Sequence, residues 1–216
     1  MDLYIIRHGD PDYDNDTLTP YGWEQAKALS KRLLKDGIDT IYSSPLGRAK
    51  ATAKPYADKT GKNIIIQPWA CEIGPVNMPN MYFLSDECME KGFRWFDLDL
   101  FPKALGEVIA AKHNGLDAML AHNGYERKND KYIPYEPNDK KIALFCHGNM
   151  SNIIIPHLLN LPVNKAYAQM VLYTTSVTVF HFDNNLEGSL PKMTMFNERS
   201  HLKDLPDPNV DKIPQA

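Results

Sequence analysis

Residues 3–9 read LYIIRHG: four apolar residues run directly into an arginine, a histidine and a glycine. A short continuous apolar run is typical of a central strand in a parallel sheet, because both faces of such a strand are covered. Residues 142–148 repeat the arrangement as IALFCHG. We therefore expect two buried strands that bring Arg7, His8 and His147 to one edge of a sheet, where the strands end.

Helix signals alternate with these strands. Thr19 and Pro20 suit an N-cap and a first helical position, and Gly37 would end that helix. Ser44 and Pro45 predict the start of a second helix in the same way. Further strands are expected at residues 38–42 and 64–66. This order predicts a three-layer α/β/α fold with a mostly parallel central sheet.

The alternation breaks between Gly74 and Lys140, a segment rich in Met, Asn and aromatic residues. We interpret residues 1–216 as a single domain in which residues 74–140 form an insertion that covers the active site and sets specificity. Within and after the insertion the pattern predicts helices at 87–96 and 103–120, a loop at 123–141, a strand at 142–146, a helix at 149–159, and an antiparallel strand pair at 176–182 and 192–196.

Composition bounds the class of protein. The 216 residues carry a formal net charge of −3, which gives no general attraction to nucleic acid or to anionic lipid. Three cysteines make no disulfide framework, and no apolar run approaches the ~20 residues that cross a bilayer. We expect a cytoplasmic protein that binds neither nucleic acid nor membrane. The sequence leaves the oligomeric state open.

Five residues carry the chemistry that we expect at the strand ends: Arg7, His8, Arg48, Glu72 and His147. Two arginines, two histidines and a carboxylate in one pocket suit a dianionic phosphoryl group, because guanidinium groups match phosphate oxygens in bidentate fashion. Helix N-termini would add backbone donors.

Several motifs resemble the histidine phosphatase superfamily, which is also called phosphoglycerate mutase-like. They are RHG at 7–9, LTPYGWEQA at 18–26, SSPLGRAKATA at 43–53, Glu72 in CEIG, and CHG at 146–148. FNERSHL at 196–202 is similar to a C-terminal signature of many phosphatase members, with Asn197, His201 and Leu202. The resemblance covers the N-terminal third well and the later core in patches, but not residues 74–140.

The resemblance implies a role for each of these residues. His8 would be the nucleophile and would form a phosphohistidine. Arg7, Arg48 and His147 would hold the phosphoryl oxygens, and Glu72 would protonate the leaving group and later activate water. The scheme requires neither a metal nor a cofactor.

The sequence also departs from the family pattern. The position where many members have a phosphate-contacting asparagine holds Asp14, so the direct contact is lost or passes to Asn15. Asn149 replaces a second glycine after His147, and its backbone N–H could still face phosphate. The motif around Glu72 diverges at once, so another acid from the insertion could serve instead. The aspartates Asp10, Asp12, Asp14 and Asp16 are interpreted as loop caps, with a cation site as the alternative.

We therefore predict a phosphatase that hydrolyses a small-molecule phosphomonoester through a phosphohistidine on His8. Phosphoryl transfer of the phosphoglycerate mutase type is one alternative, since it would use the same nucleophile. A non-catalytic phosphate-binding module is the other. The partner expected in every case is a small phosphate ester.

Overall fold

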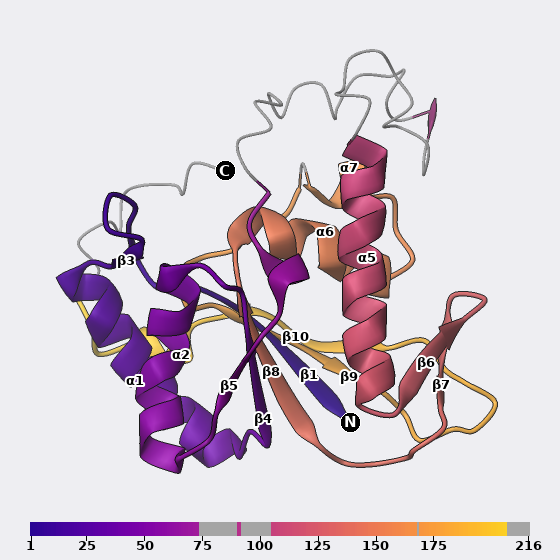
Figure 1. Ribbon diagram of the computed structural model, residues 1–216, viewed down its shortest axis with the longest axis horizontal. Coiled ribbons are helices and arrows are strands. Elements are labelled where there is room, and N and C mark those ends of the chain that lie inside the picture. The colour runs from indigo at the N-terminus through magenta and orange to yellow at the C-terminus, as the bar shows by residue number, and fades with distance from the viewer. Residues whose placement is uncertain (74–89, 92–104, 168, 207–216) are drawn as a thin grey trace.

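The first strand lies near the middle of a six-stranded sheet. The computed structural model describes residues 1–73, 90–91, 105–167 and 169–206 (Figure 1). The sheet order is β10-β9-β1-β8-β4-β5. Its strands are β1 (Asp2–Arg7), β4 (Thr40–Ser43), β5 (Ile64–Ile66), β8 (Lys141–Cys146), β9 (Val177–His181) and β10 (Lys192–Glu198). β1, β8, β4 and β5 are parallel, whereas β9 is antiparallel to both β1 and β10.

The apolar run of β1 is continuous because helices cover both faces of the sheet. Leu3 and Ile5 lie in one core cluster with residues of α5 (Leu105–His122) and α6 (Gly148–Leu158). Tyr4 and Ile6 lie in the other cluster, with residues of α1 (Pro20–Asp36) and α2 (Gly47–Thr60). Figure 1 shows these helix pairs on opposite sides of the sheet. The predicted three-layer fold with a mostly parallel sheet is confirmed.

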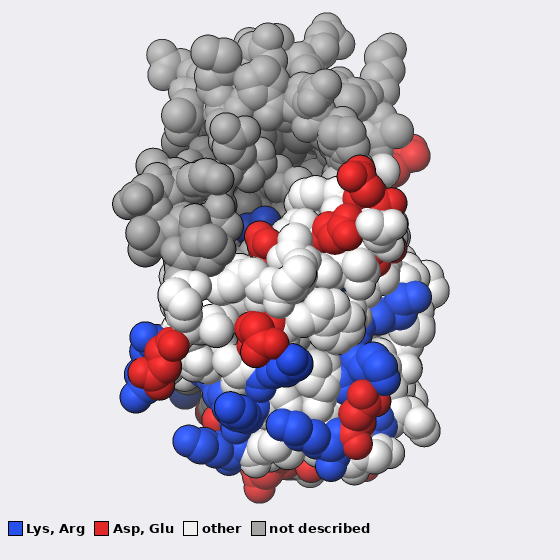
Figure 2. All heavy atoms as spheres, turned by 90° about the vertical axis from the view of Figure 1, so that its left-hand side faces the viewer, with Lys and Arg blue, Asp and Glu red and all other residues white. Residues whose placement is uncertain are grey.

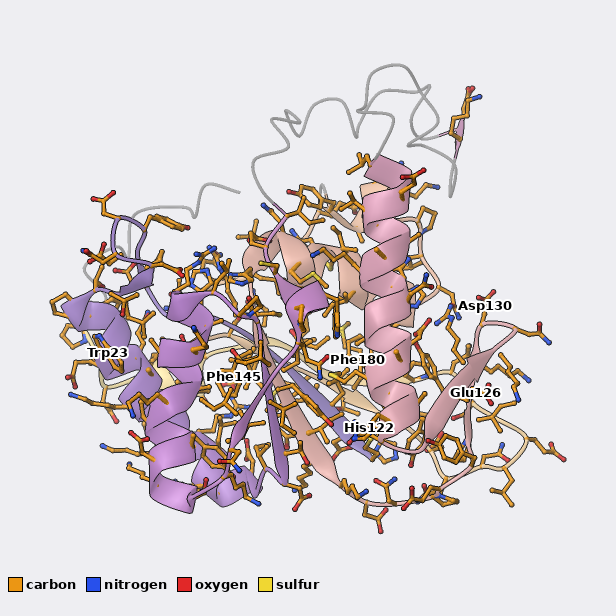
Figure 3. All side chains as sticks on the ribbon, viewed as in Figure 1. Trp23, His122, Glu126, Asp130, Phe145 and Phe180 are labelled. Carbon is orange, nitrogen blue, oxygen red and sulfur yellow. The ribbon has the colours of Figure 1, made fainter. Side chains whose placement is uncertain are left out.

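The two cores also account for the aromatic residues of the sheet. Phe145 of β8 belongs to the cluster under α1 and α2, and Phe180 of β9 belongs to the cluster under α5 and α6. Figure 3 shows the two rings on either side of the strands. Residues of β1, β8 and β9 therefore divide between two buried environments, as expected where successive side chains point to opposite faces.

The first helix begins and ends as predicted. The Thr19 hydroxyl accepts the N–H of Gly22, and Gly37 adopts a left-handed conformation with φ of 75°. The predicted start of the second helix is wrong: α2 begins at Gly47, and Leu46 occupies the N-cap without a side-chain bond. The Ser44 hydroxyl accepts the N–H of Leu46, ahead of the helix, and also bonds His147.

The predicted loop at 123–141 is also wrong. Tyr125–Lys128 (β6) and Lys131–Pro134 (β7) form an antiparallel hairpin. Asn129 and Asp130 make its two-residue turn with φ of 49° and 65°, a conformation that these residue types tolerate. The sequence pattern did not indicate these strands, because most of the hairpin's outer face is exposed and carries polar residues.

Part of the insertion lies outside the described residues. Glu90 and Lys91 are helical, but the rest of the expected helix at 87–96 is not described. The second expected helix is α5 and the third is α6, whereas the short α7 (Val163–Tyr167) was not predicted. The covering role of residues 74–140 stays a prediction. In the described residues, no helix has the length and apolar character that a membrane span requires.

Figure 2 shows the face of the molecule that α1 and α2 form. Lysine and arginine side chains gather in the lower half of this view, and acidic side chains lie among them. Lys54 pairs with Asp58 at 2.8 Å, and Lys27 pairs with Glu24 at 2.6 Å. The described part of this face is therefore mixed in charge, which gives only a weak attraction for polyanions.

Candidate active site

The sheet register brings the functional strand ends to one level. Arg7 pairs with Cys146, and the N–H of His8 donates to the Cys146 carbonyl at 3.0 Å. On the other side of β8, the N–H of Ser44 donates to the Phe145 carbonyl at 2.9 Å. The residues that follow β1, β8 and β4 therefore meet at one edge, as the sequence predicted.

The two histidines face each other in this edge. Their ring centroids are 5.2 Å apart at an interplanar angle of 60°. His8 is 2% exposed and His147 is fully buried. Burial lowers the pKa of His8 to about 3, and the nearby Arg7 and Arg48 also lower it. Burial and the neighbouring His8 lower the pKa of His147 to about 2, so both rings are neutral near pH 7.

The first hydrogen bond of His8 fixes which nitrogen can attack. Nδ1 lies 2.7 Å from the carbonyl oxygen of Gly9. A carbonyl oxygen only accepts, so Nδ1 must carry the proton of the neutral ring. Nε2 then keeps its lone pair, which is the state that a nucleophilic imidazole requires.

His147 has the opposite arrangement. Its Nε2 lies 2.7 Å from the hydroxyl oxygen of Ser44, which already accepts the N–H of Leu46 at 3.2 Å. Because the oxygen accepts this N–H, the Ser44 hydroxyl can use its own proton to donate to Nε2. In that arrangement Nδ1 of His147 carries a proton, and this atom is buried without a partner among the described residues. A neutral His147 can donate a hydrogen bond to an anion from this position.

Two arginines lie beside the histidines. Arg7 donates to the carbonyl of Leu172 and packs against Gly148, where an added Cβ would stand 3.3 Å from its Cζ. Arg48 donates to Asp16 at 2.8 Å. The Nε atoms of both arginines are buried and bond no described residue. Nδ1 of His147 and the Nε atoms of the two arginines are thus three buried donors, and both arginines influence the pKa of His8.

Three of the four aspartates in the loop after β1, Asp10, Asp12 and Asp16, accept hydrogen bonds within or next to the loop. Asp10 accepts from the Thr19 hydroxyl at 2.6 Å, and Asp12 accepts from Asn15. Asp16 accepts the N–H of Gly47 at 2.5 Å as well as the Arg48 guanidinium. Asp16 therefore ties the start of α2 and its arginine to this loop.

Glu72 lies at the N-terminus of α6. Its carboxylate accepts the N–H groups of Met150 at 2.9 Å, Ile73 at 3.1 Å and Asn149 at 3.3 Å. Burial raises the pKa of Glu72, although these donors and Arg7 act in the other direction. A raised pKa is what a carboxylic acid needs in order to donate a proton near neutral pH.

The two asparagines that were predicted to contact phosphate form hydrogen bonds with other residues of the protein. Asn15 is exposed, and its side-chain amide donates to Asp12 at 2.8 Å. The backbone N–H of Asn149 bonds Glu72, and its side chain accepts from the Tyr167 hydroxyl at 2.6 Å. Substrate binding by Asn15 and Asn149 stays a prediction, since these side-chain hydrogen bonds join each asparagine to a residue other than the two histidines.

Comparison with known proteins decides the family. The model of the histidine phosphatase superfamily (branch 1) matches residues 3–190. The chain belongs to the histidine phosphatase superfamily. It is 36% identical over 214 residues to the putative phosphoserine phosphatase 2 of Hydrogenobacter thermophilus, covering 94% of this chain and 98% of the relative. It is 30% identical to a probable phosphoglycerate mutase of Serratia proteamaculans, covering 99% of each chain.

Solved structures include a similar phosphatase. A phosphoserine phosphatase mutant of Entamoeba histolytica, in complex with phosphoserine, superposes with a TM-score of 0.65. The identity is 26%, covering 93% of this chain and 98% of the other. The same protein is also known in complex with 3-phosphoglyceric acid. This chain is thus a histidine phosphatase of the phosphoric monoester hydrolase class.

Sequence reasoning missed three residues that hold the site of this histidine phosphatase together. Ser44 bonds His147, Asp16 bonds Arg48, and Lys112 of α5 donates to the carbonyls of Trp69 at 2.7 Å and Cys71 at 2.9 Å, just before Glu72. Ser44 lies inside the SSPLGRAKATA motif, where the sequence suggested a helix cap. Asp16 lies in the acidic loop after β1, where the sequence suggested a loop cap. Lys112 carries no local signal, because it acts across the space between two distant segments.

Proposed function

We propose that this histidine phosphatase hydrolyses a small phosphomonoester that carries a carboxylate, with His8 as the nucleophile. One observation carries the proposal: the buried His8 ring keeps its Nε2 lone pair beside His147, while Nδ1 of His147 and the Nε atoms of Arg7 and Arg48 are buried and bond no described residue. Buried donors without partners are costly unless a ligand satisfies them. A tetrahedral dianion matches these donors in both charge and number.

In the first proposed step, His8 Nε2 forms a bond to phosphorus while the bond from phosphorus to the ester oxygen breaks. In its protonated form, which burial favours, Glu72 gives its proton to the departing oxygen. The arginines and His147 stabilise the charge on the three remaining phosphoryl oxygens. The products of this step are an alcohol and a phosphohistidine.

In the second proposed step, water replaces the histidine. The Glu72 carboxylate accepts a proton from water as the oxygen of the water attacks phosphorus. The bond between phosphorus and Nε2 breaks, its electron pair returns to the ring, and inorganic phosphate leaves. Glu72 is then protonated again, so the enzyme returns to its first state.

The carboxylate in the proposed substrate comes from the relatives. The Entamoeba histolytica phosphatase is known with phosphoserine and with 3-phosphoglyceric acid, and both molecules carry a carboxylate near the phosphate. The 36% identical relative of Hydrogenobacter thermophilus is named as a phosphoserine phosphatase. Phosphoserine is therefore the substrate to test first on this protein.

The test measures phosphate release from phosphoserine, 3-phosphoglycerate and p-nitrophenyl phosphate in the presence of EDTA. We expect turnover by the wild type and none by His8→Ala. His122→Ala is the matched control, because this exposed histidine lies at the far end of α5. Radiolabelled substrate should leave an acid-labile label on the wild type. Substrate binding without turnover on this panel would instead support a phosphate-binding module.

A second candidate is a mutase that returns the phosphoryl group to its substrate. The observation in its favour is the 30% identical Serratia proteamaculans relative, which is named a probable phosphoglycerate mutase. Both reactions use the same phosphohistidine and differ in whether water reaches it. Conversion of 3-phosphoglycerate to 2-phosphoglycerate faster than phosphate release would favour the mutase.

A further inference from the structure

A loop between α7 and β9 contacts Arg7, the last residue of β1, and His8, which follows it. The carbonyl of Leu172 accepts from the Arg7 guanidinium. The N–H of Thr175 lies 3.1 Å from the backbone carbonyl of Arg7 and 3.1 Å from that of His8. Residues 171–173 of this loop form no regular secondary structure. The position of the Arg7 side chain therefore depends on what holds this loop.

Asn197 of β10 holds the loop through its side-chain amide. Its Nδ2 donates to the carbonyl of Val171 at 2.8 Å, and its Oδ1 accepts the N–H of Tyr173 at 3.0 Å. These two bonds bracket Leu172, whose carbonyl contacts Arg7. The amide thus acts on the loop as a neighbouring strand would, with one donor and one acceptor.

The backbone of β10 is shaped to make this contact. The pairing of β10 with β9 is irregular between Met195 and Glu198. Within this irregular stretch Asn197 has a left-handed conformation, with φ of 51°. Asparagine tolerates this conformation better than most residues. Its short amide also supplies both bonding functions, whereas aspartate would lack the donor.

A second residue of the same C-terminal segment contacts the loop. His201, in the short helix η3 (Ser200–Leu202), places Nε2 3.2 Å from the Thr175 hydroxyl. Asn197 and His201 belong to the FNERSHL motif, which the proposed phosphatase mechanism does not use. Both contact the loop that forms hydrogen bonds with Arg7 and His8.

We infer that Asn197 is a positioning residue that acts through Arg7: its amide fixes the loop at 171–173, and the Leu172 carbonyl then holds the guanidinium in the phosphate pocket. The inference depends on the proposed role of Arg7. Without the amide, the loop no longer fixes the Leu172 carbonyl. The guanidinium then loses its orientation, and the protein binds the transition state less tightly.

The test is a double-mutant cycle on kcat/KM for p-nitrophenyl phosphate. Asn197→Gly removes the amide and keeps the backbone conformation free of strain. We expect this change to lower kcat/KM by about tenfold or more in the wild type. In the Arg7→Ala background we expect it to have an effect below about twofold, because the residue through which it acts is absent.

Two further variants separate positioning from general stability. Asn197→Asp keeps the acceptor for Tyr173 and loses the donor to Val171, so its kcat/KM should lie between those of the wild type and Asn197→Gly. Thr194 lies on β10, as Asn197 does, and its hydroxyl donates to the Val179 carbonyl of β9. Thr194→Val removes this bond and should leave kcat/KM unchanged. Thermal unfolding of each variant checks that it is folded, and Asn197→Asp replaces Asn197→Gly in the cycle if the latter does not fold.

The possible outcomes are distinguishable. If Asn197→Gly lowers kcat/KM by the same factor in both backgrounds, or leaves it unchanged in the wild type, the positioning role is wrong. If Arg7→Ala itself leaves kcat/KM unchanged, the proposed role of Arg7 fails instead.

Discussion

Two histidines that follow neighbouring strands differ in which ring nitrogen is left free, because each makes its first hydrogen bond through a different atom. His8 uses Nδ1 to donate to the Gly9 carbonyl, so its Nε2 can attack. His147 uses Nε2 to meet the Ser44 hydroxyl, so its Nδ1 can donate. The spacing of the two histidines in the sequence does not show which nitrogen makes the bond. For His147 the partner, Ser44, follows a different strand.

The Ser44 hydroxyl offers a direct test of this assignment. Ser44→Ala leaves Nε2 of His147 without its donor, so the ring can protonate Nε2 and lose the Nδ1 donor. We expect kcat/KM to fall about tenfold, the rate equivalent of one hydrogen bond of about 1.4 kcal/mol. Steady-state kinetics with p-nitrophenyl phosphate measure this effect.

The neighbouring Ser43 is the matched control. It is equally buried, and its hydroxyl donates to the Ser44 carbonyl at 2.9 Å instead of meeting the histidine. Ser43→Ala should therefore keep kcat/KM within about twofold of the wild type, as expected of a change outside the catalytic groups. Equal losses in the two variants would refute the proposed control of the tautomer.

Among single residues, the sequence predicted those whose position follows from a strand end. Arg7, His8 and His147 directly follow or end apolar runs, and parallel strands end at a common edge. The contacts of Asn15 and Asn149 could not be predicted in this way. Each makes bonds with neighbours that the fold brings together, Asp12 for the first and Glu72 for the second.

At the scale of elements, the start of α2 is held against the loop after β1. Gly47 is the first residue of α2, and a Cβ added there would lie 1.9 Å from the backbone carbonyl oxygen of Asp16. That contact is far inside van der Waals distance, and its partner is backbone. Either the loop or the helix must move if residue 47 gains a side chain.

Gly47→Ala should therefore destabilise the protein although alanine favours helices. Helix propensity would contribute about 1 kcal/mol in favour of alanine. Overpacking against the backbone costs about 1–3 kcal/mol, and the shift would also move Arg48. We expect a lower midpoint of urea unfolding and a kcat/KM reduced by more than about tenfold. Lys50→Ala, on the exposed side of the same helix, is the control and should change neither quantity.

A Gly47→Ala variant as stable and active as the wild type would show that the loop adjusts without cost.

Elements with a strong local signal, such as the capped helix α1, were predicted closely. The β6–β7 hairpin was not, because its buried residues, Tyr125 and Tyr132 among them, are separated by polar residues that resemble a loop.

At the scale of the whole molecule, the layers could be predicted but the strand order could not. Continuous apolar runs such as Leu3–Ile6 indicate burial on both faces, which requires helices on both sides of the sheet. The place of β8 between β1 and β4 depends on pairing between distant segments. Likewise, the run Ile64–Ile66 indicated a strand, but it lies at the sheet edge, where Ile65 and Ile66 are 43% and 42% exposed.

The buried histidines make the stability of the whole molecule depend on pH. Burial lowers the pKa of His8 to about 3, whereas an unfolded histidine titrates near 6.5. Below pH 6.5 the unfolded chain takes up a proton that the folded His8 does not. The contribution of His8 to stability is thus complete above pH 6.5 and is lost as pH falls toward 3. His147 acts in the same direction, and Glu72, with a raised pKa, acts in the opposite one.

Comparison of His8→Ala with the wild type isolates the contribution of one ring. We expect the free energy of unfolding to fall between pH 7 and pH 5 in both proteins, by about 2 kcal/mol less in His8→Ala. Urea unfolding at the two pH values measures the difference. The exposed His122 provides the control, since His122→Ala should follow the wild type. Equal losses in the wild type and His8→Ala would mean that the folded His8 takes up a proton as readily as the unfolded one, and a neutral nucleophile held by burial would then be wrong.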